Sequence, residues 1–110
     1  MPEAQRVPVN VYETDGAVVL VAPFPGVMAD DIEIHVDGRT VTLRAGIRSA
    51  ATKRDYLLHE WDYGPYERDV EIPDGFAGEA SASFGNGQLA VRVKKGTGGS
   101  SGKVEVNTQG

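Results

Sequence analysis

The 110-residue sequence contains no cysteine, so a disulfide framework, a thiol nucleophile and a thiolate metal site are all excluded. It also lacks a long apolar run. The longest, residues 17–24, is far shorter than a membrane span and is interrupted by Pro23. The first residues lack the apolar core of a signal peptide. We therefore expect a cytoplasmic protein that does not act at a membrane.

Positive charge is not in excess either. The net charge of −5 offers no general attraction to phosphate backbones, so nucleic acid is not expected as a partner. Only two histidines are present, His35 and His59. They lie far apart in the sequence, each within an alternating segment, and each is most simply a surface or interface residue.

Motifs of catalysis and of metal binding are missing. Ser81 and Ser83 lack the glycine context of a nucleophile elbow. The acidic pair Asp30-Asp31 is not followed by the remaining ligand positions of a calcium loop. We expect no catalytic residue, no metal ligands and no cofactor, and the chain is predicted not to be an enzyme.

Apolar residues that recur at every second position dominate the chain, which indicates strands. Asn86-Gly87 separates two such runs and is typical of a β-hairpin with a type I′ turn. Asp37-Gly38 gives a second two-residue hairpin signal. The pattern predicts an all-β fold, an antiparallel sandwich, with strands over residues 7–12, 17–22, 32–36, 41–45, 66–72, 80–84 and 89–93.

Residues 46–61 fit two structures. Ile47, Ala50, Ala51, Leu58 and Trp61 would share one face of a helix, whereas residues 56–61 alone also fit a strand that ends at the turn 62–65. Periodicity leaves both open.

The composition changes after Lys95. Residues 96–102 are glycine, serine and threonine and predict a flexible linker. Val104-Glu105-Val106 then returns to a β pattern. It is either a frayed end or a short extended peptide that docks on a sheet edge with its two valines in pockets.

Several of these motifs, in this order and spacing, resemble the small heat-shock proteins with their α-crystallin-type domain. The hairpin reads Ala82-x-x-x-Asn86-Gly87-x-Leu89, and the tail triplet resembles the family's isoleucine-x-isoleucine motif. The other matching segments are residues 21–27, with their Pro-Gly turn, residues 30–34, and residues 66–73, where Arg68 stands at the place of the family's arginine.

The resemblance implies an immunoglobulin-like sandwich in which a strand on the central loop is exchanged within a homodimer. Residues 56–61 would be that strand, paired with residues 9–12 of the second subunit. Only about six residues precede the first strand, and valines stand in the tail where the family usually has isoleucines, so higher oligomers are not expected. The interface would comprise Val9, Val11, Tyr12, Tyr56, Leu57, Leu58, His59, Trp61 and Arg68. An inward Arg68 needs a partner, for which Glu60, Asp62 and Asp69 are available.

The implied function is that of an ATP-independent holdase, which binds non-native client proteins and suppresses their aggregation. The expected groove is lined by Ile32, Ile34, Val36, Ala80, Ala82, Phe84 and Leu89, and the tail docks through Val104, Glu105 and Val106. The alternative is a CS-domain-like adaptor or cochaperone that binds a folded chaperone and lacks an exchanged strand. A structural or carbohydrate-binding sandwich leaves the tail motif and Arg68 unexplained. Three segments are expected: a short N-terminal arm (1–6), the α-crystallin-type domain (7–95) and a flexible tail (96–110).

Overall fold

A computed structural model of the chain describes residues 4–46, 55–61, 65–97 and 102–108. In these residues ten strands form two five-stranded sheets, with one short 3₁₀ helix between β3 and β4. The elements are β1 (Gln5–Arg6), β2 (Asn10–Glu13), β3 (Ala17–Pro23), η1 (Ala29–Asp31), β4 (Ile32–Asp37), β5 (Thr40–Ala45), β6 (Tyr66–Glu71), β7 (Ala80–Gly85), β8 (Gln88–Lys94), β9 (Gly102–Val104) and β10 (Val106–Thr108).

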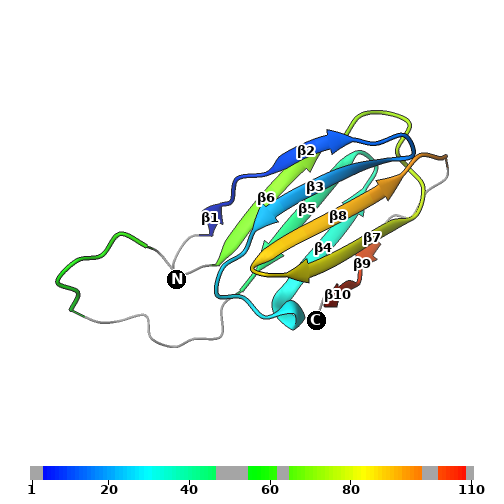
Figure 1. The fold of residues 1–110 in the computed structure, drawn as a ribbon. Coiled ribbons are helices and arrows are strands. Elements are labelled where there is room, and N and C mark those ends of the chain that lie inside the picture. The colour runs from blue at the N-terminus through cyan, green and yellow to red at the C-terminus, as the bar shows by residue number, and fades with distance from the viewer. Residues whose placement is uncertain (1–3, 47–54, 62–64, 98–101, 109–110) are drawn as a thin grey trace.

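The two sheets face each other as a sandwich, which confirms the predicted fold class (Figure 1). The first sheet has the order β1-β6-β5-β4-β9 and the second β10-β7-β8-β3-β2. Six of the seven predicted strands are present with small shifts at their ends. Both sheets are mixed, because β1 pairs with β6 and β10 pairs with β7 in parallel, while the other pairs are antiparallel.

Alternation along each strand builds the core. In β4, Ile32, Ile34 and Val36 are buried and the residues between them are exposed. β3 is buried on both faces over most of its length, as its near-continuous apolar run predicts. The inward side chains of both sheets are mostly branched aliphatic residues, with a few alanines and aromatic rings, and they form one hydrophobic cluster between the layers.

The two hairpin loops have the positive φ angles that their turn types require. Asn86 and Gly87 have φ of 52° and 74°, the two positive values of a type I′ turn, which confirms the prediction there. The loop between β4 and β5 is Gly38-Arg39, one residue later than the predicted Asp37-Gly38, because Asp37 pairs with Thr40 in the ladder. Only Gly38 has a positive φ there, 61°, as the first position of a type II′ turn requires.

The predicted strand over residues 7–12 is wrong as a single strand. The chain pairs with β6 of the first sheet over β1, leaves it, and pairs with β3 of the second sheet over β2. Pro8 lies in the crossing, and it has no backbone N–H to contribute to a ladder.

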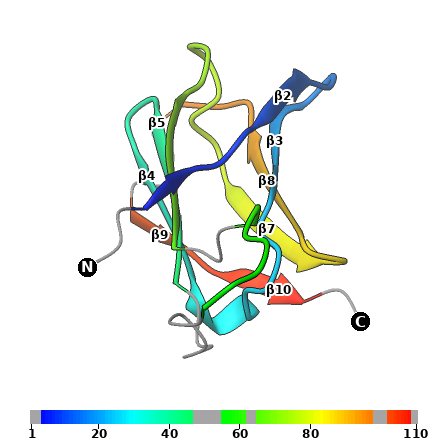
Figure 2. The same cartoon turned by 90° about the vertical axis from the view of Figure 1, so that its left-hand side faces the viewer.

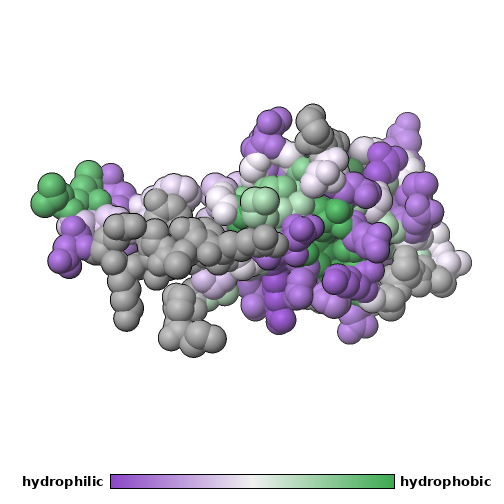
Figure 3. Space-filling view, turned by 90° about the horizontal axis from the view of Figure 1, so that it is seen from below, coloured by the Kyte–Doolittle hydropathy of each residue, from purple (hydrophilic) through white to green (hydrophobic). Residues whose placement is uncertain are grey.

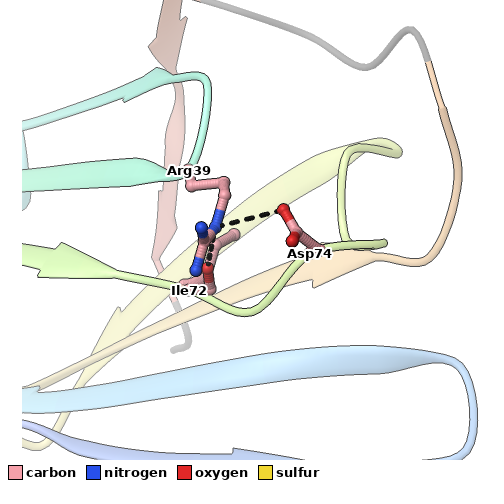
Figure 4. Close-up of polar contacts among 3 residues, drawn as sticks. All are labelled: Arg39, Ile72 and Asp74. Atoms are coloured by element: carbon pink, nitrogen blue, oxygen red, sulfur yellow. Dashed lines mark hydrogen bonds and ion pairs between the residues drawn. The ribbon is translucent and has the colours of Figure 1, made fainter.

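Side-chain contacts fasten the ends of the sandwich. Arg39, at the β4–β5 turn, donates from Nε to the carbonyl of Ile72 at 2.9 Å and approaches Asp74 at 3.3 Å (Figure 4). At the opposite end Tyr66 stacks on Phe24, with ring centroids 5.6 Å apart, and donates its hydroxyl to the carbonyl of Pro25 at 3.1 Å. The first set of contacts ties the β4–β5 turn to the segment after β6 within one sheet, and the second ties β6 of the first sheet to the loop after β3 of the second.

Candidate functional site

One edge of the sandwich is covered by the C-terminal segment. β9 pairs antiparallel with β4, placing Val104 opposite Ile34, and β10 pairs parallel with β7, placing Val106 opposite Ala82. The segment passes from the first sheet to the second at the exposed Glu105. It thus adds one short strand to each sheet, which is β-augmentation by a piece of the same chain.

The predicted groove lies under this segment. All seven predicted residues are on β4, β7 or the start of β8. Five are buried: Ile32, Ile34, Val36, Ala82 and Leu89. Ala80 and Phe84 are partly buried against the same core. Val104 is itself 8% exposed and belongs to the core cluster, and Val106 packs against it. With the tail in place, the furrow and its occupant form one continuous apolar core.

The linker prediction is tested only at its ends. Gly96 donates its backbone N–H to the carbonyl of Gly75 at 3.1 Å, and Gly102 already lies in β9. Residues 98–101 lie outside the described part of the chain.

The opposite edge of the second sheet is β2. It pairs with β3 on one side and is last in its sheet, and all four of its residues are exposed. Val11 and Tyr12, two predicted interface residues, are 44% and 53% exposed, whereas Val9 is half-buried against the core. An open strand edge with exposed apolar side chains is a template for pairing with another strand.

Residues 55–61 project away from the sandwich (Figure 1). They belong to no helix and no strand of their own chain, and residues 47–54 lie outside the described part. Leu57 is fully exposed, Leu58 is 74% exposed and Trp61 is 49% exposed, and hydrophobic colour gathers at the end of this projection (Figure 3). Tyr56 stacks on His59 with ring centroids 4.4 Å apart. The exchange of this segment stays a prediction.

Arg68 lies on the inward face of β6 between the buried Tyr66 and Val70, as predicted, and is half-buried. Within the described part of its own chain, Arg68 pairs with neither Glu60 nor Asp69, two of the available partners. The Nη1 of Arg68 donates to the backbone carbonyl of Val7 at 2.9 Å, and Asp69 points to the other face, where it accepts from Thr42 at 2.7 Å. Asp62 lies outside the described residues.

Metal-ligand types are present, but they are not gathered in the part of the chain that the structure describes. Within the described ranges, no three His, Cys, Asp or Glu side chains are close enough to share a metal ion. His35 is on the exposed face of β4, opposite Lys103. The described residues also contain no helix long and apolar enough to span a membrane. What the described residues offer is an open strand edge at β2 and exposed apolar side chains on residues 56–61.

Sequence reasoning missed the role of residues 5–9. They cover the edge of β6 much as the tail covers the edge of β4. The available signal was the repeated spacing, because Val7-Pro8-Val9 has the same Val-x-Val form as the tail triplet.

Comparison with known proteins adds to this geometry. Residues 10–107 match the family model described as the Hsp20/alpha crystallin family. The chain is 29% identical to small heat shock protein C2 of Rickettsia felis over 100 residues, covering 88% of this chain and 65% of that protein. It is 31% identical to an 18.8 kDa class II heat shock protein of Ipomoea nil, covering 80% of this chain and 56% of that protein. The chain thus spans less than two thirds of the length of these curated relatives.

A solved structure has a similar overall fold. The hspA protein of Xanthomonas axonopodis superposes with a TM-score of 0.74 at 26% identity, covering 84% of this chain and 96% of the other.

Proposed function

This chain belongs to the Hsp20/alpha-crystallin family, and from that premise we propose that it is an ATP-independent holdase that binds partly unfolded proteins and suppresses their aggregation. Family membership supports a chaperone role. Holding a non-native protein requires no reaction, only a surface that competes for its exposed apolar segments before they meet one another. We propose no enzymatic activity and a cytoplasmic location. We also propose an arm (1–6), a domain (7–95) and a tail (96–110).

The furrow between β4 and β7 carries this proposal. It accepts an extended segment with two valines two positions apart, by ladder bonds to both sheet edges and by burial of the valines. A non-native chain offers the same chemistry: unpaired backbone groups and β-branched apolar side chains. We propose that client segments and the tail compete for this furrow.

Dimerisation is the second part of the proposal. Residues 56–61 expose Leu57, Leu58 and Trp61, and β2 leaves one strand edge open. Pairing of this segment with β2 of a second subunit would extend that sheet by one strand and cover these side chains. The match to the family supports this over the CS-domain-like adaptor, which would lack an exchanged strand.

The test combines light-scattering mass with aggregation of a heat-denatured enzyme, in the absence of nucleotide. We expect twice the mass of one chain and reduced turbidity of the enzyme. Leu58→Asp should shift the protein to the mass of one chain, because a charge in the interface would be desolvated without a partner. Met28→Asp, at a side chain 57% exposed and outside the proposed interface, is the matched control and should leave the mass unchanged. A single-chain mass without protection of the enzyme would refute the proposal.

A further inference from the structure

At each edge of the sandwich, a terminal segment of the chain passes from one sheet to the other. Figure 2 shows the N-terminal segment passing from the first sheet to β2 of the second, and below it the tail passing from β9 to β10. We call residues 5–9 the N-terminal crossing. This crossing covers the edge of β6, on which only the two-residue strand β1 lies. The proposed function does not use the edge of β6.

The two crossings bury the same pattern of side chains. Val7 is 3% exposed and belongs to the core cluster, Pro8 is exposed, and Val9 is half-buried against the cluster. In the tail, Val104 is buried, Glu105 is exposed and Val106 is half-buried. Each edge of the sandwich therefore accepts an extended segment with β-branched residues two positions apart.

The ladder that holds the N-terminal crossing is short. Its pairing with β6 covers two residues, Gln5 opposite Tyr66 and Arg6 opposite Glu67. The N–H of Gln5 donates to the carbonyl of Pro65 at 2.8 Å, and Arg68 donates to the carbonyl of Val7 at 2.9 Å. Segments held by few ladder bonds are the first to open in native proteins.

The surface beside this edge is hollow. A depression of about 490 Å³ is lined by apolar and charged residues together, and it continues past the start of the N-terminal crossing at Ala4. Its lining residues are Ala4, Asp30, Asp31, Glu33, Arg44, Ala45, Gly46, Pro65, Tyr66 and Glu67. A longer extended peptide at the same edge would thus find space beyond the position that residue 5 now occupies.

We propose that the edge of β6 is a second docking site for extended non-native polypeptide with β-branched apolar residues two positions apart. In the free protein the N-terminal crossing occupies this site, and Arg68 binds a backbone carbonyl of whichever segment lies there. An arginine donor recognises the carbonyl independently of the side chain, as a site for varied sequences requires. The inference rests on the proposed function for its ligand class, but uses a different edge.

The probe is a synthetic peptide with the sequence of residues 5–10 and a photo-crosslinker in place of the exposed proline. It is added to the full chain as wild type and with Val7→Ser, which loosens the crossing. We expect labelling of β6 to rise at least tenfold in Val7→Ser, the ratio that about 1.4 kcal/mol produces. Val104→Ser is the matched control at the other edge and should raise labelling of β4 and β7 only.

Arg68→Gln in the Val7→Ser background should weaken probe binding about tenfold, corresponding to about 1.4 kcal/mol, whereas Arg68→Lys retains a donor and should weaken it less. Labelling confined to β4 and β7 in the Val7→Ser protein would overturn the inference. So would labelling of β6 that is no greater in Val7→Ser than in the wild type.

Hydrogen exchange of the wild-type protein provides a second test, which requires no variant. The amide of Gln5 should exchange much faster than the ladder amides of β8, because the crossing opens locally. Equal protection would overturn the inference. If the probe fails at β6 while the wild type still suppresses aggregation, this inference fails and the proposed function stands. If the probe labels β6 without any suppression, the proposed function fails.

Discussion

Truncating both tail valines, as Val104→Ala with Val106→Ala, should release the tail from its furrow. Each substitution removes two carbon atoms, worth about 0.8 kcal/mol apiece when fully buried. Val104 is 8% exposed and so loses close to the full amount, about 1.5 kcal/mol, while the half-buried Val106 loses about half of that. The docked state should therefore lose about 2 kcal/mol relative to the free tail, a shift of roughly 30-fold in the equilibrium.

Two assays report this shift. Hydrogen exchange of the β9 and β10 ladder amides should accelerate roughly 30-fold if local opening limits exchange. Suppression of aggregation by a fixed amount of protein should increase, because clients then meet less competition for the furrow. The light-scattering mass should stay the same, since the tail pairs with strands of its own domain.

Glu105→Ala is the matched control, because it alters the same triplet at its exposed position and removes no buried carbon. It should change neither exchange nor protection. The reasoning fails if the double variant exchanges at the wild-type rate, or if its protection of clients is unchanged or reduced.

Two further substitutions test the scaffold by urea denaturation. Gly78→Ala should destabilise the fold by about 1–3 kcal/mol, because a Cβ there would lie 2.6 Å from the carbonyl oxygen of Lys95; Gly46→Ala, with no atom within 4 Å, is the control and should cost far less. A midpoint for Gly78→Ala equal to that of Gly46→Ala would contradict this packing. Arg39→Ala should cost about 0.5–1.5 kcal/mol, mainly through the hydrogen bond to Ile72, since its ion pair is exposed. A urea midpoint for Arg39→Ala equal to that of the wild type would show that the hydrogen bond from Arg39 to Ile72 does not stabilise the fold.

Much of the fold could be predicted because the strands carry their own pattern. In β4 and β8 every second residue is buried and the residues between are exposed or half-buried, a two-residue periodicity that indicates a strand. The turn at Asn86-Gly87 was equally readable, because few residue pairs tolerate two positive φ angles. The same periodicity places the residues predicted to line the groove on the inward faces of β4, β7 and β8, while their role in binding stays a prediction.

The pairing of short segments could not be predicted in the same way. Residues 7–12 alternate as one strand would, yet the chain changes sheets within them, because β6 and β3 each offer an edge there. The partner of Arg68 was missed for the same reason: the carbonyl of Val7 becomes available only where the crossing passes β6. Every residue has a backbone carbonyl, so the sequence does not indicate which of them accepts the hydrogen bond from Arg68.

The sequence by itself determined six of the seven predicted strands, their inward faces, the turn at Asn86-Gly87 and the Val-x-Val form of both end segments, because these depend on local backbone preference and on periodic burial. Only the tertiary structure decided which edges those segments cover. Short strands of two or three residues have too little pattern to specify a partner, and they pair where the packed sheets leave both an unpaired edge and an apolar furrow.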